Sequence, residues 1–191
     1  MSRTTWVETL IAAQGDSTAL TNTVTATSIL PGSGKLVLPA GILSSIGQRL
    51  RVTAAGRIST VVTTPGTLTL DVRVGPASPP TIICANGGAM TLSTTAKTNV
   101  AWALEWMLTL RALGNGTSAN FMHQGWFMSE AAGATTVVGE AKSVLLPQSA
   151  PAVGTGFDST VSLFVDLFGT WSVANAANSI QTHQFAVELM N

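Results

Sequence analysis

The side chains that could carry metal or redox chemistry are few and lie far apart in the sequence. The chain has two histidines, His123 and His183, and neither has another ligand-type residue at the spacing that zinc sites use. Two histidines also fall short of a three-histidine catalytic site. The one cysteine, Cys84, excludes an internal disulfide and a zinc site with several cysteines, and its apolar neighbours predict a buried side chain. We therefore expect no metal ion and no cofactor.

A hydrolase would need an activated nucleophile or a pair of carboxylates, and the sequence offers neither in a recognisable arrangement. The turn Gly-x-Ser-x-Gly, which exposes a nucleophilic serine, is absent, and Gly15-Asp16-Ser17 is predicted to be a loop. Glu105, Asp158 and Asp166 fall on predicted strands, but nothing places two of them at the ~5–9 Å that glycosidases require. We expect no enzymatic activity, and only carboxylates or a Ser-His pair converging in a cleft would favour a hydrolase.

One tryptophan stands apart from the others in its surroundings. Trp102, Trp106 and Trp171 fall on the apolar phase of predicted strands and are expected in the core. Trp126 instead shares its face with Gln124, while the opposite face of the same strand carries phenylalanines. An exposed indole at this position would stack on a sugar ring or anchor a partner protein.

Four arginines define a second candidate site. Arg49, Arg51, Arg57 and Arg73 occupy the polar phase of the strands predicted around residues 50–75. One interpretation is a solvated sheet face. The other is a docking surface for an acidic partner, because these residues are much of the positive charge of the chain.

Composition narrows the classes of partner. Only 9% of the 191 residues are charged, against ~25% in an average soluble protein, and the formal net charge is +0. Without a basic excess, binding to nucleic acid is not expected. No window approaches the ~18 continuous apolar residues of a membrane span, and residues 1–6 lack the apolar core of a signal peptide, so we expect synthesis in a cytoplasm and no membrane partner. So little charge gives weak self-repulsion, which favours assembly with other subunits.

The elements that would position these residues are predicted most clearly in the stretch 50–75. Apolar and polar residues alternate from Leu50 to Val62 and again from Leu68 to Val74, which predicts two half-buried strands joined at Pro65-Gly66. A direct hairpin would place Arg57 opposite Arg73, and like charges across a ladder destabilise it. Either the register differs or the two strands lie in different sheets. We favour the second, in which they line one core from two sides, as in a jelly roll.

Further strands are predicted along the rest of the chain. Residues 100–111 alternate as a strand, with a helix through Trp102 and Trp106 as the rival interpretation. Residues 161–171 are apolar on both faces because Phe164 and Phe168 lie opposite valines and leucines, which indicates a buried strand or a subunit contact. Residues 1–20 are predicted to be an N-terminal arm or a short helix. Residues 21–191 are predicted to be one all-β domain, a jelly-roll-like β-sandwich with about eight to ten strands.

Several segments together resemble virion proteins of tailed bacteriophages. These segments are the run from Thr25-Ala26-Thr27-Ser28-Ile29-Leu30-Pro31 to Arg57-Ile58-Ser59-Thr60, then Val74-Gly75, Trp102 to Arg111, and Gly154-Thr155-Gly156-Phe157-Asp158 to Gln184-Phe185. They are most similar to the small β-sandwich proteins of the capsid decoration, or cement, group. The resemblance implies a jelly-roll homotrimer, made in the host cytoplasm, that binds the major capsid protein on the outer surface of the phage head.

The resemblance itself carries no binding motif, but the low charge and the apolar faces of the chain suggest contact roles for several residues within this interpretation. The four arginines and Trp126 would face the partner, and the N-terminal arm with Trp6 would reach the capsid or a neighbouring protomer. Phe164 and Phe168 would supply contacts between protomers. A trimer that grips neighbouring capsid subunits adds interface area that must be lost before a DNA-filled shell opens.

A second interpretation makes the chain a glycan- or receptor-binding β-sandwich module of a phage tail or fibre. Trp126 and nearby loop residues would then hold a sugar, because aromatic faces are the usual platform for such rings. Loss of glycan binding on replacement of Trp126 would favour this interpretation over a decoration role.

Overall fold

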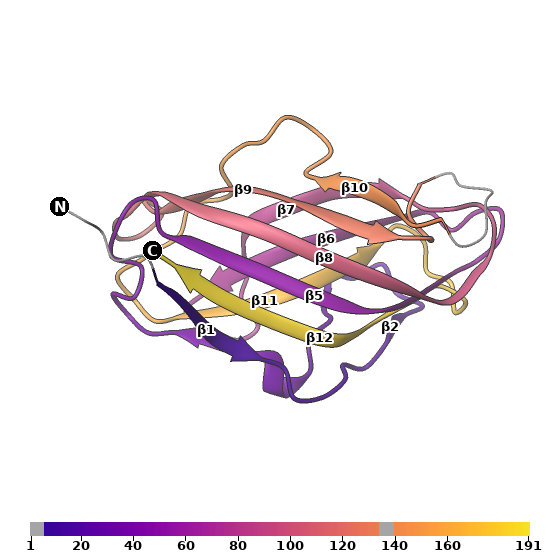
Figure 1. Cartoon of the computed structure of the whole chain (residues 1–191), viewed down its shortest axis with the longest axis horizontal. Helices are drawn as coiled ribbons and strands as arrows, with labels where there is room; N and C mark the ends of the chain where they lie inside the picture. Colours follow the sequence, from indigo (N-terminus) through magenta and orange to yellow (C-terminus); the bar gives the residue numbers. More distant parts are fainter. Residues whose placement is uncertain (1–5, 134–139) are drawn as a thin grey trace.

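Alternating apolar and polar residues build two antiparallel β-sheets that pack face to face (Figure 1). This computed structural model describes residues 6–133 and 140–191. In these residues the regular structure consists of twelve strands and one 3-10 turn, Gly32–Gly34, without an α-helix. The predicted all-β sandwich is confirmed. No helix of the described residues is long and apolar enough to span a bilayer.

Sheet A, the larger layer, has seven strands, and sheet B has five. The order in sheet A is β1 (Val7–Ala12), β12 (Ser179–Met190), β5 (Arg49–Thr60), β8 (Lys97–Ala112), β9 (Asn120–Ser129) and β10 (Lys142–Leu146), with β2 (Leu20–Thr21) on β12. The order in sheet B is β3 (Thr27–Ser28), β11 (Leu163–Trp171), β6 (Thr67–Gly75) and β7 (Ile82–Thr91), with β4 (Leu36–Leu38) on β11.

Large apolar side chains from both sheets fill the space between the layers. The largest fully buried residues include Trp106, Trp171, Phe121, Phe127 and Phe157. Trp102 stacks on Phe127 with ring centroids 5.8 Å apart, and Cys84 is fully buried. The core positions predicted for the three tryptophans and the cysteine are confirmed. Each aromatic ring removes ~150–250 Å² from water, so these residues dominate the stability of the sandwich.

The strands β5 and β6 part into different sheets, as the charge argument predicted. Arg57 on β5 lies opposite Gln181 and Ala101 in sheet A. Arg73 on β6 lies opposite Asp166 on β11 in sheet B, so its cross-strand neighbour on β11 is a carboxylate and not a second arginine. Inward residues of both strands are buried in the shared core: Leu50, Val52, Ala54, Ile58, Leu68, Leu70, Val72 and Val74.

The structure corrects or decides two other predictions, one for residues 97–112 and one for the N-terminal segment 1–20. The helix through Trp102 and Trp106 is wrong, because residues 97–112 form β8 and pair with β5 and β9, and this pairing overrides the helix propensity of the alanines and leucines. The segment 1–20 is extended where it is described, since β1 adds an edge strand to sheet A beside β12. Residues 1–5 of that segment lie outside the described residues.

The strand connections match a jelly roll only in part. The chain crosses between the sheets six times: from β2 to β3, β4 to β5, β5 to β6, β7 to β8, β10 to β11 and β11 to β12. It stays in one sheet from β6 to β7 and from β8 through β10, because strands that follow each other closely in sequence pair directly. The strands therefore do not alternate strictly between the two sheets, as they would in a regular jelly roll.

Candidate binding face

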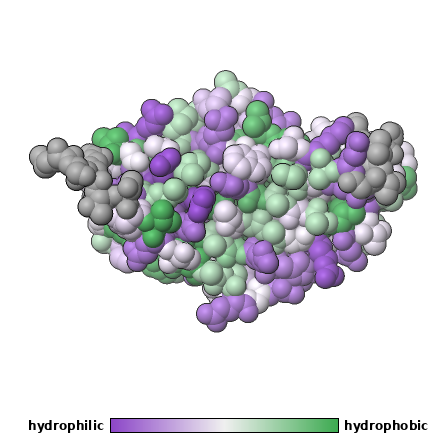
Figure 2. Space-filling view, in the orientation of Figure 1, coloured by the Kyte–Doolittle hydropathy of each residue, from purple (hydrophilic) through white to green (hydrophobic). Residues whose placement is uncertain are grey.

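The outer face of sheet A is made by the outward-pointing residues of six paired strands. Since side chains alternate along each strand, residues in register form rows across the sheet. One row runs from β1 to β10 through Ala12, Ala186, Thr53, Glu105, Trp126 and Leu145. Figure 2 looks onto this face, with weakly hydrophobic groups over its middle and hydrophilic groups toward its rim.

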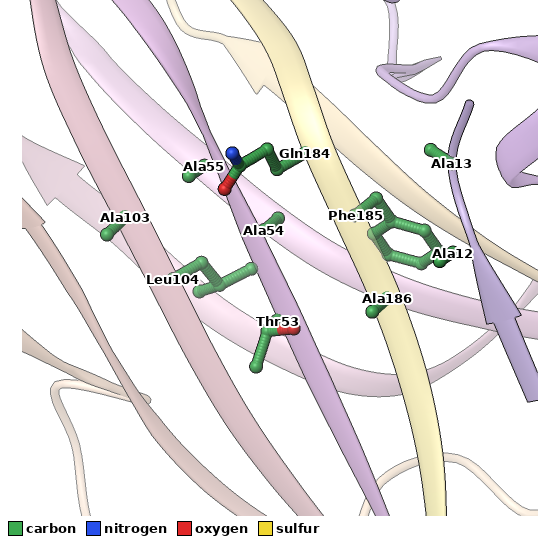
Figure 3. Close-up of a pocket in the computed structure, with 10 residues that line it drawn as sticks. All are labelled: Ala12, Ala13, Thr53, Ala54, Ala55, Ala103, Leu104, Gln184, Phe185 and Ala186. Carbon is green, nitrogen blue, oxygen red and sulfur yellow. The ribbon is translucent and has the colours of Figure 1, made fainter. Parts of the chain in front are cut away.

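Alanines form the floor in the middle of this face. Ala55 on β5 lies directly opposite Ala103 on β8, and Ala186 lies opposite Ala12 where β12 meets β1 (Figure 3). Because a methyl group projects less than the neighbouring Gln184, the floor is a shallow hollow of about 440 Å³. The residues that line it, all within the described part of the chain, carry no charge. Such a floor allows the close approach of a flat partner surface.

A second hollow, also of about 440 Å³, lies beside Trp126 on β9. The indole is 41% exposed. The walls come from β8, β9, β10 and the segment after β10, and they include Met107, Thr109, Arg111, Met122, Gln124, Leu145 and Pro151. Gly125 precedes the tryptophan, and a Cβ at this position would collide with the carbonyl oxygen of Glu105. Glycine therefore lets β9 lie close against β8 beneath the hollow.

Methionine is concentrated on the same face. Four of the six methionines point outward from β8, β9 and β12: Met107, Met122, Met128 and Met190. A methionine side chain is flexible and polarizable, so it packs against irregular apolar surfaces. Together with Trp126 and the 57% exposed Leu145, these residues make an apolar area on an otherwise polar surface.

The arginines of β5 differ in their partners. Arg51 pairs with Glu188 on β12, with its Nε 2.6 Å from the carboxylate. Arg49 and Arg57 point outward and form no ion pair among the described residues. Arg111, at the end of β8, joins them on this face and lines the hollow of Trp126. Sequence reasoning missed Arg111, although its position in the alternation of residues 100–111 gave the signal.

Arg73 does not belong to the same surface. It lies on the outer face of sheet B, where it binds the carboxylate of Asp71 at 2.5 and 3.2 Å and covers the ring of Phe168 at 4.2 Å. Burial raises the pKa of Asp71, and the guanidinium of Arg73 opposes that rise. The four arginines predicted as one docking surface are thus divided between opposite faces of the sandwich.

The outer face of sheet B satisfies its own charges. The buried carboxylate of Asp166 accepts a hydrogen bond from Ser28 at 2.7 Å and lies 3.2 Å from the ammonium of Lys35. Phe168 is only 5% exposed under Arg73, whereas Phe164 is half-buried. The proposed contact role of these two phenylalanines stays a prediction, and Phe164 is the more accessible of the pair.

The residues considered for catalysis do not converge. Glu105 lies on the outer face of sheet A, Asp166 on that of sheet B, and Asp158 in the segment between β10 and β11. Asp158 accepts hydrogen bonds from Thr160 and from the amide of Gly116, which lower its pKa and tie two loops together. Within residues 6–133 and 140–191, no three metal-ligating side chains are grouped.

The two histidines have structural partners. His123 is buried, its Nδ1 accepts the indole N–H of Trp106 at 3.3 Å, and its Nε2 lies 3.4 Å from the amide nitrogen of Asn86. Burial lowers the pKa of His123, so the ring stays neutral at pH 7. His183 sits at an irregularity of β12, and its Nδ1 lies 2.8 Å from the carboxylate of Asp16.

Trp6 lies at a corner of sheet A and away from Trp126. It precedes β1 and is 37% exposed. Its carbonyl oxygen accepts a hydrogen bond from the amide of Asn191 at 3.3 Å, so the start of the described chain and its last residue are neighbours. The structure does not bring the two candidate tryptophans into one site.

The fold and this surface define an all-β sandwich with one open, apolar face bearing unpaired arginines. No family model matches the chain, and no curated protein matches it. The chain has a distant structural similarity to two phage proteins. The CBM2 module of the evolved Dit of Lactobacillus casei BL23 phage J-1 has a TM-score of 0.37 at 10% identity, covering 98% of this chain and 97% of the other.

The second similar structure is the conserved carbohydrate esterase of the Shiga toxin-encoding bacteriophage phi24B. Its TM-score is 0.29 at 14% identity, with 96% of this chain and 99% of the other covered. Similarities of this size assign neither a family nor a ligand. The function therefore has to be inferred from the surface of the chain itself.

Proposed function

We propose that this chain is a non-enzymatic structural protein of a tailed-phage virion that binds the head by docking the outer face of sheet A on the major capsid protein. The observation that carries the proposal is the contrast between the two outer faces. Sheet B pairs its charges internally, through Arg73 with Asp71 and Lys35 with Asp166. Besides the Arg51–Glu188 pair, sheet A presents methionines, Trp126 and three arginines that form no ion pair among the described residues, and these residue types are enriched at protein interfaces.

The size of the face fits a protein interface. Arg49 and Arg57 stand eight residues apart on β5, which is ~27 Å at the rise of a strand, and six strands span roughly 25 Å. The face therefore covers ~650 Å², close to the ~800 Å² that each partner contributes to a stable complex. Docking over such an area would add contacts that must break before the shell opens. The homotrimer belongs to the same proposal, and light scattering that finds a monomer at micromolar concentration would refute it.

A pair of substitutions tests the docking face without changing its charge. Ala101→Gln with Ala103→Gln places two long amides on exposed positions of β8, where the methyl groups now leave room. If this face docks, binding to particles produced without the chain falls about tenfold or more, because each amide has to be accommodated or desolvated at a cost of ~1–3 kcal/mol. Ala174→Gln with Ala176→Gln, in the exposed turn between β11 and β12, is the matched control. Equal binding by both variants would end the proposal.

One specific observation supports a second candidate, a glycan-binding module of a tail or fibre. The exposed indole of Trp126 stands beside a hollow that also holds Gln124, Thr109 and Arg111, and these groups offer hydrogen bonds to sugar hydroxyls. A glycan-array signal that disappears with Trp126→Ala and persists with Ala101→Gln would favour this candidate, since residue 101 lies four residues along β8 from Glu105, the neighbour of Trp126. Absence of any signal from the unmodified protein would exclude the array's sugars as ligands.

A further inference from the structure

Of the five arginines within residues 6–133 and 140–191, three form no ion pair, and all three are on the proposed docking face. All nine acidic residues of the sequence lie in the described part of the chain. Lys35, Arg51, Arg73 and Lys97 each pair with one of them: Asp166, Glu188, Asp71 and Glu130. Arg49, Arg57 and Arg111 have no ion-pair partner among residues 6–133 and 140–191.

The three arginines stand toward the ends of the face along the strands, and the alanine floor, Trp126, Glu105 and the Arg51–Glu188 pair lie between these ends. Arg49 pairs across the ladder with Thr109, and Arg111 follows two residues later on β8, so these two mark one end. Arg57 marks the other end, where it lines a hollow of about 320 Å³ together with Asn99 and Gln184. Along the strands, the row that holds Ala186 and Trp126 therefore lies between the two ends marked by the arginines.

The face is positively charged although the chain is neutral. Its four arginines, with Arg51 included, stand against two glutamates, Glu105 and Glu188, while the formal net charge of the whole sequence is +0. The pair of Arg51 with Glu188 is neutral, so the remaining charges of the face are Arg49, Arg57 and Arg111 against Glu105. The positive charge is therefore local to the surface that would be covered.

Covering these arginines with a neutral partner would be unfavourable. A guanidinium that loses water without gaining an acceptor carries an uncompensated charge into the interface. Carboxylates remove that cost, because arginine binds them through two parallel N–H donors in a fixed geometry. The same pairs also accelerate encounter between the two proteins and fix their register.

We infer that the partner is an acidic protein surface that brings carboxylates to Arg49 and Arg111 at one end and to Arg57 at the other, and an apolar side chain to the hollow of Trp126 between them. This inference rests on the proposed docking function and names the chemistry of its partner. It replaces the arginine set expected from sequence, since Arg51 and Arg73 are already neutralised within the chain. The apolar contact supplies affinity, and the three arginines supply selection for acidic partners.

The test compares two variants with the same net charge. Arg49→Gln with Arg57→Gln and Arg111→Gln removes three positive charges from the face. Thr25→Glu with Ala77→Glu and Ser162→Glu adds three negative charges at exposed loop positions outside sheet A. Binding to phage particles produced without the chain is measured from about 50 to about 500 mM NaCl, a range in which the screening length falls from ~14 to ~4 Å.

The expected result is a loss of at least about tenfold for the glutamine variant at low salt and little loss for the loop variant. The affinity of the unmodified protein should also fall with salt more steeply than that of the glutamine variant. Equal losses in both variants would mean a general charge effect and would overturn the inference. Unchanged binding of the glutamine variant, together with the loss caused by Ala101→Gln and Ala103→Gln, would refute the acidic partner while leaving the docking face in place.

Discussion

Asn178 joins the turn before β12 to the crossing between the two sheets, and its replacement should destabilise the fold strongly. The side chain is fully buried. Its Nδ2 donates to the carbonyl oxygen of Pro65 at 2.9 Å, and its Oδ1 accepts the amide N–H of Val61 at 2.9 Å. Both partners belong to the segment that carries the chain from β5 in sheet A to β6 in sheet B. Asn178→Ala leaves these two backbone groups without a partner.

The size of the effect follows from those two groups. A buried polar group that loses its hydrogen-bond partner costs ~1–3 kcal/mol. Pro65 is buried, but Val61 is half-buried and its N–H regains some water, so we expect a total of about 2–4 kcal/mol. In a chain of this length each kcal/mol lowers the melting temperature by ~2–4 °C, which gives a decrease of roughly 4–16 °C.

Urea unfolding followed by tryptophan fluorescence measures the change as a lower midpoint with an unchanged slope. The matched control is Asn175→Ala, because Asn175 sits in the same turn and its side chain accepts only the exposed amide of Ala177 at 2.8 Å. The control should lose less than about 1 kcal/mol. A loss below about 1 kcal/mol for Asn178→Ala, or equal losses for both variants, would refute the role of this side chain in holding the crossing.

Three further outcomes follow from the structure. Of the five tryptophans, Trp6 and Trp126 are the exposed ones, so Trp126→Phe should reduce acrylamide quenching of fluorescence, whereas Trp106→Phe should not. Burial lowers the pKa of His123 below its unfolded value of ~6.5, so the folded state binds fewer protons than the unfolded state, and the free energy of unfolding does not depend on this group above pH ~6.5. As the pH drops from ~6.5 toward the folded pKa, the free energy of unfolding should fall by up to ~1.4 kcal/mol per pH unit. In urea titrations, His123→Gln should remove this slope. Arg73→Met should cost ~3–5 kcal/mol because it leaves the buried carboxylate of Asp71 unpaired, and Asp71→Asn should recover much of the loss in a double-mutant cycle; additive losses would contradict this coupling.

The sandwich was predictable from sequence wherever one face of a strand is apolar and the other polar. Trp102, Trp106 and Leu108 recur at every second position, and this period identifies β8 as a strand despite its helix-forming composition. The separation of β5 from β6 was predictable because a direct pairing would oppose two arginines. Both predictions depend on local sequence and on the sign of charges, which the sequence states directly.

The binding face was predictable only in part, for a geometric reason. The alternation of a strand tells which residues point out of the core, but a sandwich has two outer faces, and the alternation alone does not tell them apart. The expected separation of β5 from β6 already implied that Arg49 and Arg73 face opposite sides, so the prediction of one surface for all four arginines was inconsistent with it. The pairing of Arg51 with Glu188 joins strands 137 residues apart, so the neutralisation of that arginine was also hidden.

The hydrogen bond between Trp6 and Asn191 brings the start of β1 and the end of β12 together, so the sandwich could be inserted as a unit into another protein. A chain that enters and leaves at one corner of a sheet can be spliced into a single surface loop of an unrelated scaffold, because the two ends of that loop need to be only ~5 Å apart. Both junctions would lie at the edge formed by β1 and β12, as Figure 1 shows, and the Trp126 end of sheet A would remain free.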